Sequence, residues 1–170
     1  EFDPAGSKKV LIFIGGLLDG LLTVPYLGML SSKLKEIGWS LIQIQISSSH
    51  IGWGTGSLVR DSSEIGELVA YLRSAAGGNR ETIGIMGHST GCQNTIHYLS
   101  KFEPSENQIL DFGILQAPVS DRISGGESIP KDEFDESVEY AKDLIDSGNQ
   151  NELMPSKYAK YFFSVPTTAY

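Results

Sequence analysis

The sequence predicts an α/β fold: a mostly parallel sheet with helices on both faces, and a helical, lid-like insertion near the C-terminus. Short β-branched runs alternate with segments of helical spacing, and such alternation with right-handed crossovers gives a parallel sheet. The runs are continuously apolar, as in strands buried on both faces. A chain of 170 residues, 40% of them hydrophobic, suffices for one domain with a sizeable core.

The expected elements follow in order along the chain. Four apolar runs predict strands, at residues 10–14, 41–46, 82–86 and 109–116. Helices are expected over 25–37 and 89–102, with a third before residue 82. There, an apolar stripe at i, i+3, i+4 and i+7 consists of Ile65, Leu68, Val69 and Leu72. Ligands of such sheets bind at the carboxyl ends of the strands, so we expect a site in the loops that follow them.

The last part of the chain has a different pattern. An amphipathic helix without a neighbouring strand is predicted by Phe134, Val138, Ala141 and Ile145. We therefore divide the chain into a core over residues 1–126 and an acidic, helical, lid-like segment over 127–170. Nine of the 21 acidic residues lie within 127–152, as is usual for a solvated helix face.

Charge and composition exclude several classes of partner. The net charge is −8, and no basic stripe could neutralise phosphates, so we expect no nucleic acid. The longest apolar run, 10–18, is shorter than the roughly 18 residues of a membrane span. We see no signal segment and no Asn-x-Ser/Thr site, and Cys92 is the single cysteine. These features predict a cytoplasmic protein.

No cofactor or metal site is expected. The glycine-rich segment 15–20 has Leu17 at the middle position of a G-x-G-x-x-G pattern, where a dinucleotide needs bare backbone. A Walker-type loop is absent, and no histidine or second cysteine is spaced for a metal with Cys92.

The sharpest motif is Gly87-His88-Ser89-Thr90-Gly91, a G-x-S-x-G between an expected strand and an expected helix. A nucleophilic serine must project from a sharp, strained turn, and flanking glycines supply the room. The N–H groups at the start of the helix favour a developing alkoxide. The motif therefore predicts Ser89 as a catalytic nucleophile.

Two backbone N–H groups are expected to hold the oxyanion of a tetrahedral intermediate. One belongs to Thr90, directly after the nucleophile, and the other to Leu17 in the loop after the first strand. A plain glycine turn is the alternative interpretation of that loop. Gly16, His50 and Trp53 also follow expected strands, and we expect them to line a substrate pocket.

The partners of Ser89 are less evident. Asp121 follows the fourth strand and is the candidate acid, although an ion pair with Arg122 would explain it equally. His50 is a candidate base at the pocket. His88 reads as structural, and His97 as a packing or surface residue about 12 Å along the helix from Ser89.

Together these motifs resemble the α/β-hydrolase superfamily. More narrowly, segments 13–21, 51–58, 87–93 and 116–122 look like a mainly fungal family of serine hydrolases related to siderophore esterases. The resemblance implies ester hydrolysis through an acyl-enzyme, with a small-molecule ester as substrate and hydroxamate siderophores as candidates.

In one respect the sequence departs from the superfamily that it resembles, namely in the order of the catalytic residues. In the superfamily the chain order is serine, acid, then a histidine after the last strand, and here only His97 follows Ser89. We therefore interpret residues 1–126 as a partial hydrolase core. We expect the 170-residue chain to be nearly inactive alone, and its partner to be its own C-terminal part beyond Tyr170. A non-catalytic binding module, or an acyltransferase or thioesterase, remains an alternative.

Overall fold

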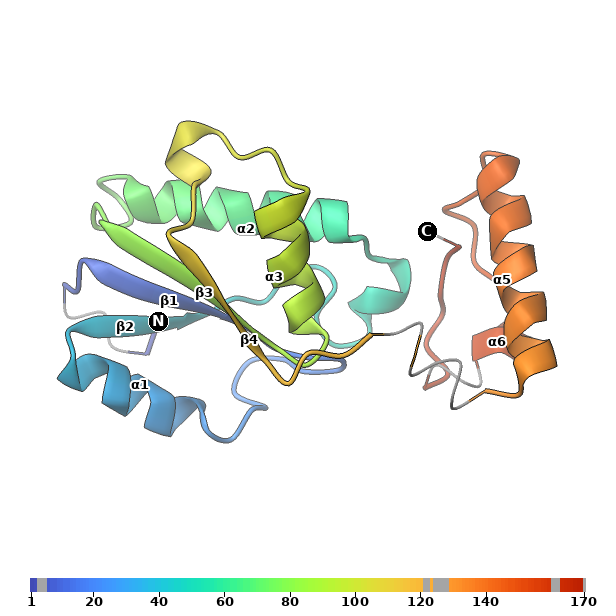
Figure 1. Cartoon of the computed structure of the whole chain (residues 1–170), viewed down its shortest axis with the longest axis horizontal. Helices are drawn as coiled ribbons and strands as arrows, with labels where there is room; N and C mark the ends of the chain where they lie inside the picture. Colours follow the sequence, from blue (N-terminus) through green and yellow to red (C-terminus); the bar gives the residue numbers. More distant parts are fainter. Residues whose placement is uncertain (3–5, 121–122, 124–128, 160–162, 170) are drawn as a thin grey trace.

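A four-stranded, all-parallel sheet forms the centre of the computed structural model (Figure 1), which describes residues 1–2, 6–120, 123, 129–159 and 163–169. Its strands lie in the order β2-β1-β3-β4. Their bounds are β1 Lys9–Ile14, β2 Trp39–Gln43, β3 Thr82–His88 and β4 Phe112–Gln116. In register, Ile12 of β1 lies between Ile42 and Ile85. The predicted α/β class with a parallel sheet is confirmed.

Helices cover both faces of the sheet, as Figure 1 shows. They are α1 Leu27–Glu36, α2 Leu58–Arg73 and α3 Gly91–Ser100, with short 3-10 turns η1 Gly52–Thr55 and η2 Glu106–Gln108. Because side chains alternate along β1, Ile12 packs on the α2 side with Ile65 and Val69, whereas Phe13 packs on the α1 side with Leu27. The two faces therefore carry separate apolar clusters.

Two strands differ from the sequence prediction at their ends. β2 ends at Gln43 because Ile46 turns away, with its N–H donating to Ser49 Oγ and its carbonyl accepting from the Ser49 N–H. β4 starts at Phe112 because the Asp111 carboxylate, 2.7 Å from Ile83 N, replaces a ladder bond. Side chains thus compete with the ladder at both places.

The expectation of burial on both faces fails for β4. Ile114 and Leu115 are 40% and 45% exposed, whereas β1 is buried from Val10 to Ile14. Within the described residues, β4 pairs only with β3. β4 is thus an apolar edge strand, a kind of surface that proteins normally cover.

The acidic C-terminal helix is present as α5, Lys131–Asp146, followed by the short α6, Ser156–Ala159. Figure 1 shows both beyond the ends of the strands, apart from α1 to α3. The segment contacts the core at η1, where Thr168 N donates to Gly54 O at 2.8 Å. Its division from the core at residue 127, and a lid role, stay predictions. None of the helices that the structure describes is long and apolar enough to cross a membrane.

The phenol of Tyr98 connects α3 to η2, and it makes stability sensitive to alkaline pH. Tyr98 is 2% exposed, its hydroxyl donates to Gln108 O at 2.6 Å, and burial raises its pKa from 10.0 to about 12. The folded state keeps this proton while the unfolded state loses it, so stability falls as pH rises from about 10 to about 12. Unfolding free energies at successive pH values should fall more steeply for the wild type than for Tyr98→Phe. Equal slopes would contradict this.

Candidate active site

Ser89 occupies a sharp turn between β3 and α3. Its φ of +53° lies in the left-handed region, which a residue with a side chain adopts at a cost. Two hydrogen bonds hold the turn: Ser89 N donates to Gln116 O at 3.0 Å, and Ser89 O accepts from Cys92 N at 3.1 Å. The serine thus has the strained backbone that the motif predicts for a nucleophile.

The glycines on either side of Ser89 are required by close backbone approaches. A Cβ on Gly87 would lie 2.3 Å from Gly91 O, and a Cβ on Gly91 would lie 2.5 Å from Gly15 O. Both obstacles are backbone atoms, which cannot rotate away as a flexible side chain would. The turn can therefore form only with glycine at both positions.

The loop after β1 lies directly against the nucleophile. A Cβ on Gly16 would be 2.8 Å from Ser89 Cβ. Asp19 fixes this loop, because its carboxylate accepts from Gly16 N at 2.7 Å and from Thr23 Oγ1 at 2.9 Å. Asp19 was not predicted from the sequence, because its side chain accepts from a backbone N–H three residues earlier in a loop without regular structure.

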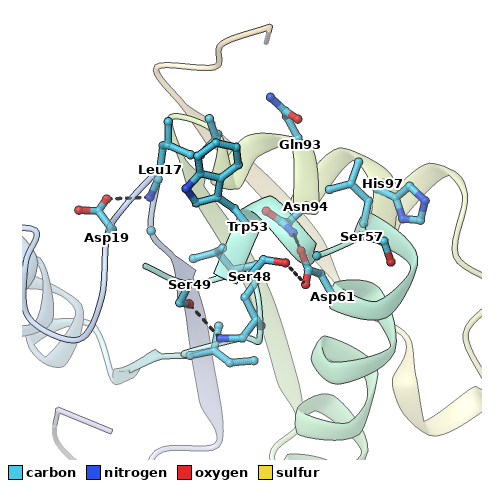
Figure 2. A pocket seen from close by; sticks show the side chains of 18 of the residues that line it. Leu17, Asp19, Ser48, Ser49, Trp53, Ser57, Asp61, Gln93, Asn94 and His97 are labelled. Atoms are coloured by element: carbon cyan, nitrogen blue, oxygen red, sulfur yellow. Dashed lines mark hydrogen bonds between the residues drawn. The ribbon is translucent and has the colours of Figure 1, made fainter. Parts of the chain in front are cut away.

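A cavity of about 460 Å³ opens beside this turn, at the carboxyl ends of β1 and β2 (Figure 2). Four of the residues that the sequence analysis placed at the site line it: Gly16, Leu17, Trp53 and Thr90. Ser89 lies next to this lining, between Gly16 and Thr90, but is not part of it, and neither is His50. Its ring lies against Gly20, where a Cβ would be 2.0 Å from His50 Nε2.

Trp53 also lines a second cavity, of about 220 Å³, whose other walls belong to α5, α6 and the segments between and after them. Phe134 and Val138 of α5 and Tyr158 of α6 are among these walls. η1, which carries Trp53, is thus shared by the site and the C-terminal segment.

The other two histidines are engaged in side-chain contacts. The His88 ring stacks on Phe13 and contacts the side chain of Gln116, consistent with a structural role. His97 lines the cavity, with Nδ1 2.8 Å from Ser62 Oγ. Asp121 and Arg122 lie outside the described residues. The acid and the base of Ser89 therefore stay predictions.

One buried carboxylate at the cavity was missed by the sequence analysis. Asp61 of α2 is 3% exposed, and its two oxygens accept from Ser48 Oγ at 2.6 Å and Asn94 Nδ2 at 2.8 Å. Burial raises the pKa of Asp61, partly offset by these two bonds. The sequence carried a signal: Asp61 stands four residues before Ile65, on the apolar stripe of its helix.

No group of three or more His, Cys, Asp or Glu side chains among the described residues could hold a metal ion. The described residues place the hydroxyl-bearing Ser89 against Gly16, which lines the cavity.

The family follows from a match over the whole chain. Residues 1–170 match the family model described as "Protein of unknown function (DUF1749)". The chain belongs to the DUF1749 family. The fold is similar to that of a solved "Alpha/Beta hydrolase fold protein of unknown function". That structure aligns with TM-score 0.66 at 19% identity, over 95% of this chain and 52% of that one. At that identity the likeness shows the fold alone.

Relatives of this DUF1749 chain include fungal esterases. It is 44% identical to the UPF0613 protein PB24D3.06c of Schizosaccharomyces pombe, over 96% of this chain and 52% of that protein. It is 41% identical to the Fusarinine C esterase sidJ of Aspergillus fumigatus, over 72% of this chain and 40% of that protein. The "Siderophore hydrolase EstB" of A. fumigatus aligns with TM-score 0.69 at 31% identity, over 96% of this chain and 55% of that one. The resemblance seen in the motifs is confirmed.

The chain spans about half the length of the curated relatives it matches. It is homologous, over that part, to fungal esterases.

Proposed function

We propose that the full-length protein is a serine esterase that cleaves a small-molecule ester through an acyl-enzyme on Ser89, with ester siderophores as substrates. One observation carries the proposal: Ser89 has a φ of +53° and lies against Gly16, which lines a cavity of about 460 Å³ together with Thr90. Strained, glycine-flanked serines of this kind are built to expose a hydroxyl to a bound carbonyl. The substrate class is supported by relatives named as esterases of siderophores.

The proposed reaction has two steps. Ser89 Oγ attacks the ester carbonyl and loses its proton to a base, while the N–H groups of Leu17 and Thr90 hold the oxyanion. Collapse of the tetrahedral intermediate breaks the bond to the alcohol, which leaves with the proton. Water then cleaves the acyl-enzyme in the same way and releases the acid.

The base and the acid that orients it belong to this proposal as well. None of the contacts of His50, His88 and His97 described above involves Ser89. We place the histidine in the part of the protein that the longer relatives have in addition, with Asp121 as the candidate acid. A cytoplasmic location is a further part of the proposal.

The test is to incubate the full-length protein with an ester-linked trihydroxamate siderophore and to identify the products by mass spectrometry. We expect monomeric hydroxamic acids to accumulate, and the matched amide-linked compound to persist. Binding of the ester without turnover would contradict the proposal and favour a non-catalytic module. Transfer of the acyl group to an added alcohol or thiol in preference to water would instead favour an acyltransferase.

A further inference from the structure

We propose that the cavity beside Ser89 carries a cation-binding subsite, in which Asp61 and Asn94 bind a primary ammonium group of the ester substrate. This inference rests on the proposed function only in calling the bound molecule a substrate. The binding of a cation at this place does not depend on it. The inference assigns a specificity to residues that the nucleophilic mechanism does not use.

Asp61 is a buried carboxylate that forms no ion pair with the described residues, and the nearby charge of Arg60 lowers its pKa less than burial raises it. Each of its oxygens accepts one hydrogen bond from a neutral donor, Ser48 or Asn94, and a carboxylate can accept about four. No lysine or arginine within the described part of the chain pairs with it. Its neighbour on the helix, Arg60, directs Nε towards Glu64 at 3.8 Å. A buried charge is costly unless it is paired, and a ligand cation would supply the pair.

Asn94 adds a second acceptor that faces the cavity. Its side chain is nine-tenths buried, at 8% exposure, and Nδ2 is used by Asp61. Oδ1 accepts no hydrogen bond from any residue that the structure describes, and Figure 2 shows it directed away from Asp61, on the side of Trp53. The two side chains thus offer acceptors to the same space, and an ammonium group has three donors and no acceptor.

The charge of the cavity favours the same ligand. Its lining includes two acids, Asp19 and Asp61, and neither lysine nor arginine. Asp19 is occupied with the loop after β1, which leaves Asp61 as the carboxylate available to a ligand. In a partly enclosed space this excess of negative charge attracts cations and repels anions.

A purely structural role makes a different prediction. In a structural role, Asp61 would only connect the loop at Ser48 and helix α3 to α2 through the same two hydrogen bonds. Loss of these two hydrogen bonds would then lower the stability of the fold, or reduce activity towards charged and neutral substrates alike. Only a subsite makes the effect depend on the charge of the substrate.

The experiment measures how fast the full-length protein hydrolyses two esters that differ in one group. They are the p-nitrophenyl esters of 6-aminohexanoic acid and of heptanoic acid. We expect the wild type to prefer the amino ester in kcat/KM by about tenfold to 100-fold, which is the worth of a charge-assisted hydrogen bond. In Asp61→Asn the ratio should fall to about one, and in Asn94→Ala it should fall severalfold. Glu67→Gln removes the same charge from an exposed position of the same helix and should leave the ratio intact.

A binding measurement separates this inference from the proposed function. Calorimetric titration of full-length Ser89→Ala with the N-methyl amides of the same two acids needs no turnover, and the amino amide should bind more tightly. It also serves if Asp61→Asn does not fold. Equal affinities of the two amides, or a ratio of the esters that survives in folded Asp61→Asn, would overturn the subsite. If the amino amide binds more tightly but the wild-type protein hydrolyses no ester, the subsite is supported and the proposed esterase is refuted.

Discussion

Replacement of Ser89 by alanine is expected to lower kcat of the full-length protein by about a millionfold. The hydroxyl is the attacking atom in the proposed reaction, and Ser89 is the serine of the glycine-flanked turn after β3. What remains should be the smaller contribution of substrate binding and the N–H groups of Leu17 and Thr90. Initial rates on an activated ester measure the effect.

The matched control is Ser100→Ala. Ser100 ends the same helix that Ser89 precedes, is exposed, and donates to Ile96 O at 2.6 Å. This variant should retain wild-type rates. A Ser89→Ala protein with more than a few per cent of the wild-type kcat would show that another residue is the nucleophile.

The second large effect is expected from Gly87→Ala. The new Cβ would lie 2.3 Å from Gly91 O and 2.6 Å from Cys92 N, so the turn that carries Ser89 must shift. Overpacking of this kind costs about 1–3 kcal/mol of unfolding free energy. A displacement of about 1 Å at the nucleophile lowers turnover about 100-fold. Thermal or denaturant unfolding and ester kinetics on one preparation measure both effects.

Gly28→Ala is the control for this substitution. Gly28 is an exposed residue of α1, and a Cβ there would meet no atom within 4 Å. It should keep full activity and gain about 0.4–1 kcal/mol in stability, because alanine restricts the unfolded chain. If Gly87→Ala behaved like Gly28→Ala, the tight turn at Ser89 would not be needed for function.

The fold class and the turn at Ser89 could be predicted because both depend on local patterns. Periodicity identified the stripe of α2, and the glycines around Ser89 are spaced by the steric needs of one turn. The order β2-β1-β3-β4 depends on pairing between distant segments, which no local pattern encodes. The exposure of β4 was missed for the same reason, since Ile114 and Leu115 read as buried residues in any sheet.

The position of the cavity could be predicted from the sequence, but the side chains that line it could be predicted only in part. The loops after β1 and β2 do meet there, yet the backbone of His50 turns its ring towards Gly20. Such directions depend on single dihedral angles, and a φ of +57° at His50 has no signal in the residue type. Asp61 was more accessible to prediction, because an acid on an apolar stripe must find hydrogen-bond donors when it is buried.

The most direct test of the central claim is to label the full-length protein with a fluorophosphonate and map the adduct by peptide mass spectrometry. This reagent forms a stable bond with an activated serine hydroxyl and requires no knowledge of the natural substrate. Ser89 as nucleophile predicts one adduct, on the peptide that contains Gly87 to Gly91, and none in Ser89→Ala. An adduct on another serine, or labelling that survives in Ser89→Ala, would contradict the assignment of Ser89 as the nucleophile.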